Sequence, residues 1–292
     1  LTATIWGMAF VSQSKGMDYM HPFTFNGVRS LIGAAGILVY ILISRKIAGD
    51  KAAKLDWKLN VRAGLLCGIF LTIASTLQQF GIKYTSVGKA GFITTLYIIF
   101  VPMFGIFLKK KVAPVVWAAA GMAAVGMYLL CMTESLRLGA GDIMVFLCAI
   151  AFAIQIMTVD HYAARIDGAV VSCIQFTVCG VVCCIGALIW GQPTFGQIQE
   201  GLGALLYAGV LSCGVGYTLQ IVGQKGLNPT VAALIMSLES VIATISGWIA
   251  YKIGFLSTDQ TLTPRQIAGC VIVFAAVILV QLPPEWFRFG KK

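Results

Sequence analysis

One carboxylate in this sequence lies near the middle of an apolar segment. Glu239 lies eight residues into an apolar run that we place at 231–251. At about 1.5 Å per helical residue, its side chain is roughly 12 Å from the near end, close to the middle of a bilayer. An ionisable group at that depth indicates function, and a carboxyl removed from water holds its proton more readily. Glu239 is therefore a candidate for proton coupling or cation binding; the alternative is a glutamate that only ties helices together.

A second charged residue lies inside an apolar run. Arg29 is seven residues into the run 22–44. Its guanidinium could turn inward to bind a substrate carboxylate or to pair with Glu239, or its long side chain could reach the outer membrane face. The sequence leaves both open. For Lys89, at the start of another run, we expect a side chain that reaches the membrane surface, with substrate contact as the alternative.

Glutamine side chains follow helical spacing in several apolar runs. Gln78 and Gln79 end one polar stripe, Tyr217 and Gln220 lie on another, and Gln175 lies on a third. An unsatisfied polar group in hydrocarbon costs several kcal/mol, so these side chains must meet protein or water. They predict a polar cavity between the helices. Hydrogen bonding between helices without any cavity is the alternative.

Other residue types give less specific signals. The aromatic residues Trp6, Tyr97 and Tyr217 lie well inside apolar runs, where their rings could line a cavity or could simply pack. The nine cysteines show no pairing pattern, and the two histidines have no partner spacing. No zinc, phosphate-loop or hydrolase motif occurs. We therefore predict no metal, no cofactor and no catalytic residue.

The elements that must position these residues are membrane helices. Hydrophobic residues make up 59% of the 292 residues, charged residues 11%, and the mean hydropathy is +0.89, which is more apolar surface than a soluble domain can bury. We predict an all-α membrane protein of ten transmembrane helices, the first of them a span and not a removable signal. Their ranges are 1–17, 22–44, 62–82, 87–108, 114–132, 142–163, 168–190, 202–222, 231–251 and 265–282.

The second half of the chain repeats the first. The positions Thr76-Leu77-Gln78, Gly81, Lys83, Ala90, Ile93, Leu96 and Gly105 recur 142 residues later as Thr218-Leu219-Gln220, Gly223, Lys225, Ala232, Ile235, Leu238 and Gly247. Five helices are an odd number, so the second copy must cross the membrane in the opposite direction. We predict two inverted five-helix repeats, over 1–132 and 133–292, the second with a short cytoplasmic tail. This organisation is typical of transporters.

The net charge of +10 is concentrated on alternate loops. By the positive-inside bias this predicts that both termini are cytoplasmic, and it does not indicate a nucleic-acid partner. The basic residues concerned are Arg45, Lys46, Lys51, Lys54, Lys58, Arg62, Lys109, Lys110, Lys111, Arg288, Lys291 and Lys292.

The sequence resembles the EamA-type transporters of the drug/metabolite transporter superfamily over essentially its full length. The resemblance is carried by Trp6-Gly7 with Phe10-Val11, Pro22 with Arg29, Leu238-Glu239 and Ile267-Ala268-Gly269. It implies a proton-linked or facilitative carrier of small metabolites. Many members of this family export amino acids and related compounds across the bacterial cytoplasmic membrane. It also carries over Trp6, Arg29 and Glu239 as site residues.

We therefore expect a multi-pass protein of the cell membrane that moves a small polar metabolite by alternating access, as an exporter and coupled to protons. Its predicted partners are this substrate and the lipid bilayer; the sequence says nothing of protein partners. Two other classes stay open. A translocator of lipids or lipid-linked precursors would need a side opening to the bilayer, and an integral-membrane enzyme would need a nucleophile, a metal set or paired carboxylates.

Overall fold

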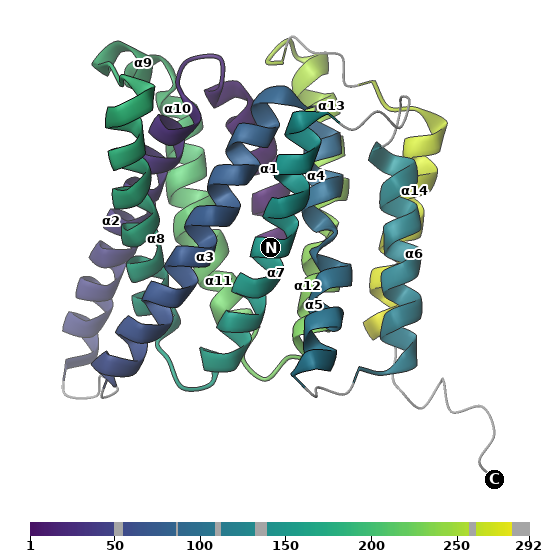
Figure 1. Ribbon diagram of the computed structural model, residues 1–292, viewed down its shortest axis with the longest axis horizontal. Helices are drawn as coiled ribbons and strands as arrows, with labels where there is room; N and C mark the ends of the chain where they lie inside the picture. Colours follow the sequence, from purple (N-terminus) through teal and green to yellow (C-terminus); the bar gives the residue numbers. More distant parts are fainter. Residues whose placement is uncertain (50–54, 86, 109–111, 132–138, 257–260, 282–292) are drawn as a thin grey trace.

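The computed structural model describes residues 1–49, 55–85, 87–108, 112–131, 139–256 and 261–281 (Figure 1). Every regular element in these ranges is a helix, and they contain no strand. The lysines 51, 54 and 109–111, the boundary between the predicted repeats and the basic tail with Arg288, Lys291 and Lys292 lie outside the described residues.

The helices follow the predicted apolar runs. In chain order they are α1 (Thr2–Gly16), α2 (Pro22–Ala48), α3 (Trp57–Tyr84), α4 (Val87–Thr95), α5 (Tyr97–Phe107), α6 (Pro114–Cys131), α7 (Ala140–Ala163), α8 (Gly168–Gly186), the π-helical η2 (Ala187–Gly191), α9 (Phe195–Glu200), α10 (Leu202–Leu206), the π-helical η3 (Tyr207–Gly216), α11 (Tyr217–Gly223), α12 (Pro229–Met236), α13 (Leu238–Lys252) and α14 (Pro264–Gln281). In the described ranges, seven helical segments are long and apolar enough to cross a membrane, and α6 and α14 contain two shorter apolar stretches. The prediction of an all-helical, multi-pass membrane protein is confirmed.

Short polar side chains begin several of these helices. The carboxylate of Asp56 accepts a hydrogen bond from the backbone of α3, that of Asp167 accepts two from α8, and the amide oxygen of Asn228 accepts one from α12. Such caps satisfy the first N–H groups of a helix, which have no partner within it. The caps thus fix where the membrane helices start.

Close approach of glycine backbones holds the bundle together. A Cβ atom on Gly7 of α1 would lie 2.6 Å from the Cβ atom of Ile242 in α13, and one on Gly141 of α7 would lie 2.9 Å from the carbonyl oxygen of Gly81 in α3. Helices in lipid gain little from hydrophobic association and depend on such contacts.

The packing pairs exchange between the two halves of the chain. Offsets of 142 to 150 residues pair α1 with α7, α2 with α8, α3 with α10–η3–α11, α4–α5 with α12–α13, and α6 with α14. Both α2 with α8 and α6 with α14 are in contact, the latter at one side of the bundle (Figure 1). α3 packs on α7 and α8, and its counterpart α10–η3–α11 packs on α1 and α2. In the same way, α13 packs on α1 and α4, and its counterpart α5 packs on α7 and α12.

Two of the predicted spans are interrupted. The sequence predicted continuous helices over 87–108 and 231–251, but the structure breaks the first between α4 and α5 and the second between α12 and α13. At the breaks, the Thr95 hydroxyl donates to the carbonyl of Phe92 at 2.9 Å, and the Ser237 hydroxyl donates to that of Leu234 at 2.7 Å. A hydroxyl that binds the preceding turn competes with the helical backbone. The two bonds are 142 residues apart.

Candidate functional site

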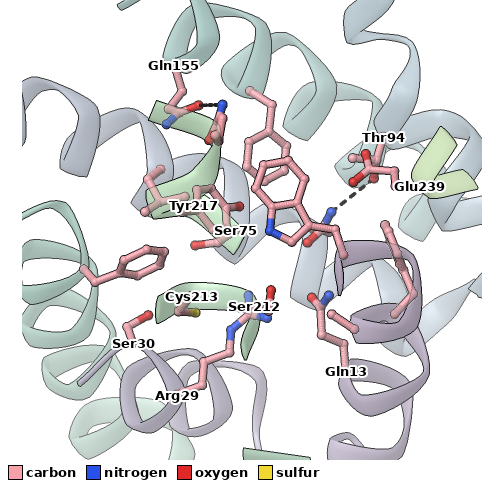
Figure 2. Close-up of a pocket in the computed structure, with 18 of the residues that line it drawn as sticks. Gln13, Arg29, Ser30, Ser75, Thr94, Gln155, Ser212, Cys213, Tyr217 and Glu239 are labelled. Atoms are coloured by element: carbon pink, nitrogen blue, oxygen red, sulfur yellow. Dashed lines mark hydrogen bonds between the residues drawn. The ribbon is translucent and has the colours of Figure 1, made fainter. Parts of the chain in front are cut away.

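A small cavity lies inside the bundle, lined by residues of α1–α5, α7, α8, η3, α11 and α13 (Figure 2). Its volume is about 40 Å³, enough for water but well below the roughly 300–1,000 Å³ of small-molecule sites. The cavity is therefore too small in this structure to hold a metabolite.

Glu239 reaches the cavity from α13. Its side chain is 4% exposed, and its Oε1 accepts a hydrogen bond of 2.9 Å from the hydroxyl of Tyr97, the first residue of α5. Both residues line the cavity. Tyr97 and Glu239 are also 142 residues apart, so they occupy equivalent positions in the sequence repeat.

Arg29 reaches the cavity from α2, on a different side from Glu239 (Figure 2). It is 5% exposed, and its guanidinium carbon lies 5.4 Å from the ring centre of Phe25. Of the two orientations that the sequence left open, the structure has the inward one. The ion pairs of the described residues do not join Arg29 to Glu239 or to any other carboxylate.

Amide side chains form the polar part of the wall. The amide of Gln220 donates to Gln155 Oε1 at 3.2 Å, Gln155 donates to Gln175 Oε1 at 3.5 Å, and Gln78 donates to the hydroxyl of Thr94 at 3.3 Å. Figure 2 marks the bonds of Gln155 and Thr94 at the cavity. Gln78 and Gln220 line the cavity, whereas Gln175 lies behind Gln155 and is not among the described lining residues.

Gln79 also lies outside the described lining. It is buried and donates to the backbone carbonyl of Gln13 at 3.2 Å. Consecutive residues of a helix point about 100° apart, and Gln79 faces α1 here while Gln78 faces the cavity. The structure turns Gln78 inward and uses Gln79 to connect α3 to α1.

Aromatic rings cover another part of the cavity. The rings of Trp6 and Tyr217 are 4.5 Å apart between centres and inclined by 51°, and Phe176 meets Tyr217 edge-on at 5.0 Å. All three residues line the cavity, together with Tyr97. Such tilted contacts are favourable for aromatic pairs.

Several polar lining residues were not predicted from the sequence. Gln13, Gln155, Ser212 and Thr94 line the cavity, and none of them was among the predicted site residues. A signal was available for the two amides, because each is a polar exception in an apolar run. Gln13 also follows Trp6 by seven residues, which places both on one helical face.

The described residues contain no group of three or more His, Cys, Asp or Glu side chains that could hold a metal ion. The lining of the cavity offers a guanidinium, a carboxyl and several amides.

Several proteins are similar to this chain over most of its length. An uncharacterized transporter of Archaeoglobus fulgidus is 27% identical over 288 residues, which cover 97% of this chain and 84% of the relative. One of Clostridium kluyveri is 22% identical over 92% of this chain and 85% of the relative. The uncharacterized transporter YwfM of Bacillus subtilis is 24% identical over 98% and 93% of the two chains.

A solved crystal structure shares the fold. It superposes with a TM-score of 0.73 at 16% sequence identity, over 98% of this chain and 99% of the other. The sequence profile of the EamA-like transporter family matches residues 1–132 and 139–282. Since this match spans nearly the whole chain, the protein belongs to the EamA-like transporter family, a family of membrane transporters.

Proposed function

We propose that this transporter carries an amino acid or a related zwitterionic metabolite through the central cavity. The observation that carries the proposal is that Arg29 and Glu239, buried groups of opposite sign, line one cavity without an ion pair between them. A substrate carboxylate would bind the Arg29 guanidinium, and a substrate ammonium would bind Glu239. A dipolar molecule would satisfy both groups at once.

Unsatisfied polar atoms on the wall support a polar ligand. Four buried atoms of cavity residues have no hydrogen-bond partner in the described part of the chain: Trp6 Nε1, Gln13 Oε1, Arg29 Nε and Gln220 Oε1. Leaving a buried polar group without a partner costs about 1–3 kcal/mol. A ligand with donors and acceptors would remove part of this cost. Gln78, Gln220 and Tyr217 would then contact the substrate directly, and Gln79 and Gln175 would hold the neighbouring amides in place.

We further propose that the chain consists of ten membrane helices in two inverted repeats, over 1–132 and 133–292. The exchange of packing pairs, the matched breaks at Thr95 and Ser237, and the contact of Tyr97 with Glu239 support a pseudo-twofold axis in the membrane plane. Under that relation, rocking of one half against the other would open the cavity to each side in turn. The cavity must enlarge during this cycle to accept a metabolite.

Two outer grooves add to the support for the axis. One is lined by Met8, Val11 and Ser12 of α1 with Ile249 and Ala250 of α13. The other groove is lined by residues at the equivalent positions of the repeat. Three of them lie 146 positions after Met8, Val11 and Ser12, and two lie 142 positions before Ile249 and Ala250. These residues are Ile154, Met157, Thr158, Phe107 and Leu108.

The proposed orientation and coupling rest on charge. Arg45, Lys46, Lys58, Arg165 and Lys225 lie at the end of the bundle where α2 and α11 end and α3 and α8 begin. The positive-inside bias places this end in the cytoplasm and, with it, both termini. We propose that Glu239 binds either a proton or the substrate ammonium, which would couple export of the substrate to proton entry.

Transport by the purified chain in proteoliposomes tests the proposal. Labelled amino acids should exchange across the membrane, and Glu239→Gln should abolish the pH dependence of the rate. Alanine at Gln78 or Gln220 should weaken substrate affinity. If Glu239→Gln keeps the wild-type pH profile, the coupling role is wrong. If the protein moves dye-labelled lipid but no amino acid, a lipid translocator replaces the proposed carrier.

A further inference from the structure

A second, larger pocket lies at the basic end of the bundle, away from the central cavity. Its volume is about 540 Å³, within the roughly 300–1,000 Å³ of small-molecule sites. It is bounded by the last turns of α2, the first turn of α3, the connection from α7 to α8, and the end of α11, at the lower edge of Figure 1. None of its lining residues belongs to the cavity described above.

Cationic side chains outnumber carboxylates around this pocket. Arg45, Arg165 and Lys225 line it, as do Asp56 and Asp167. Each carboxylate caps a helix, and the described ion pairs join only one of these cations to one of them, Arg45 Nη2 to Asp167 at 3.7 Å. Two cations therefore remain without a carboxylate partner among the described residues.

These two cations are available to a ligand. Lys225 Nζ donates to the backbone carbonyl of Ile166 at 3.2 Å, which leaves two of its three protons free. The side chain of Arg165 is exposed and makes no ion pair within the described ranges. Both residues line one pocket, and a guanidinium and an ammonium are groups that proteins use to bind phosphate.

The wall that carries these groups is fixed by a buried amide. Asn60 is 1% exposed; its Nδ2 donates to the carbonyl of Asp56 at 2.7 Å, and its Oδ1 accepts from the backbone N–H of Asp167 at 2.8 Å. It thereby ties the connection before α8 to the start of α3. The pocket is thus shaped by the hydrogen bonds of a buried side chain and is more than a gap between surface side chains.

Exposed apolar and aromatic side chains lie beside this pocket. Tyr40, which lines it, is 60% exposed, and the residues around it on α2, including Leu42 and Ile43, are exposed and apolar. Trp57, next to the lining residue Asp56, is 61% exposed. Exposed Trp and Tyr mark the depth of the lipid headgroups. A lipid in the bilayer could therefore lie along α2 with its headgroup in the pocket.

We propose that this pocket is a binding site for an anionic phospholipid. The phosphate contacts Arg165 and Lys225, the glycerol backbone lies near the end of α2, and an acyl chain follows the apolar face around Tyr40. Basic pockets between membrane helices on the cytoplasmic side suit this chemistry. The site does not depend on what the central cavity transports.

Titration of the purified full chain with phosphatidylglycerol, followed by native mass spectrometry, tests the proposal. The first binding event should be at least tenfold tighter for phosphatidylglycerol than for phosphatidylcholine. The double variant Arg165→Gln/Lys225→Gln should lose at least fivefold of the affinity for phosphatidylglycerol. A matched double variant, Lys46→Gln/Lys58→Gln, removes the same charge at the same end from outside the pocket and should change the affinity less than twofold.

Each other outcome overturns the proposal. Equal losses in both double variants would mean diffuse attraction to the basic surface, and no loss in either would mean that the lipid binds elsewhere. Displacement of the lipid by millimolar inorganic phosphate would mean that the pocket binds the free anion. Thermal unfolding of all variants checks that the changes leave the fold intact.

Discussion

The contact of α1 with α13 predicts a large effect for Gly7→Ala. The new Cβ atom would lie 2.6 Å from Ile242 Cβ and 2.7 Å from the carbonyl oxygen of Glu239. Neither atom can move away by a rotamer change, because both are held directly by the backbone. Ordinary contact begins at 3.4 Å, so the helices must separate by about 0.8 Å at this point. Overpacking of this kind costs about 1–3 kcal/mol, or roughly 5- to 150-fold in the ratio of folded to unfolded protein.

Unfolding in detergent, measured beside Gly36→Ala, checks this value. Gly36 lies inside α2, and no atom comes within 4 Å of the position that a Cβ atom would take there. Alanine at this position should therefore be neutral or stabilising by about 0.5–1 kcal/mol. Transport should also fall in Gly7→Ala, since the shift moves Trp6 and Glu239 apart. If Gly7→Ala is as stable as Gly36→Ala, the α1–α13 contact does not depend on glycine and the reasoning is wrong.

Three further changes have defined outcomes. Tyr97→Phe removes the hydroxyl that donates to Glu239 at 2.9 Å. Transport in proteoliposomes should slow roughly tenfold, and its pH profile should change. An unaltered pH profile would contradict the proposed coupling. Arg29→Lys keeps the positive charge but loses the planar guanidinium that binds a carboxylate with two hydrogen bonds. The KM should therefore rise roughly tenfold for a free amino acid and stay unchanged for its ester. An equal rise in KM for both would argue against carboxylate binding. Burial, with Lys83 nearby, lowers the pKa of His21 below its usual value. The contribution of neutral His21 to stability is therefore complete above about pH 6.5 and decreases as the pH falls toward its folded pKa. His21→Asn keeps a capping group and should reduce the loss of thermal stability on acidification. A loss as large as in the wild type would contradict this.

Much of the site could be predicted because hydrocarbon makes polar side chains conspicuous. Arg29, Glu239, Gln78 and Gln220 are polar exceptions in apolar runs, and all four line the cavity. The reason is physical: such groups need partners, and a shared polar cavity provides them. The same criterion would have selected Gln155, had it been applied to every amide in the chain.

The remainder depends on packing between distant segments. The sequence could not show that Gln79 turns to the backbone of Gln13, because that depends on the rotation of α3 against α1. Nor could the sequence show the interruptions at Thr95 and Ser237, because a hydroxyl in a helix can bind the preceding turn or leave it intact, and the packing of the neighbouring helices decides which. The offset of 142 residues, however, already relates Tyr97 to Glu239 in the sequence.

That pair says something about how such a chain can be built. In the proposed inverted arrangement, two separate five-helix chains related by a twofold axis would place one residue against its own copy on that axis. Two glutamates there would repel each other, and two tyrosines would leave the site without an acid. Covalent fusion removes this restriction, because each half can then carry a different residue. A half-length polypeptide could therefore not recreate this donor and acceptor by dimerising, however well its helices packed.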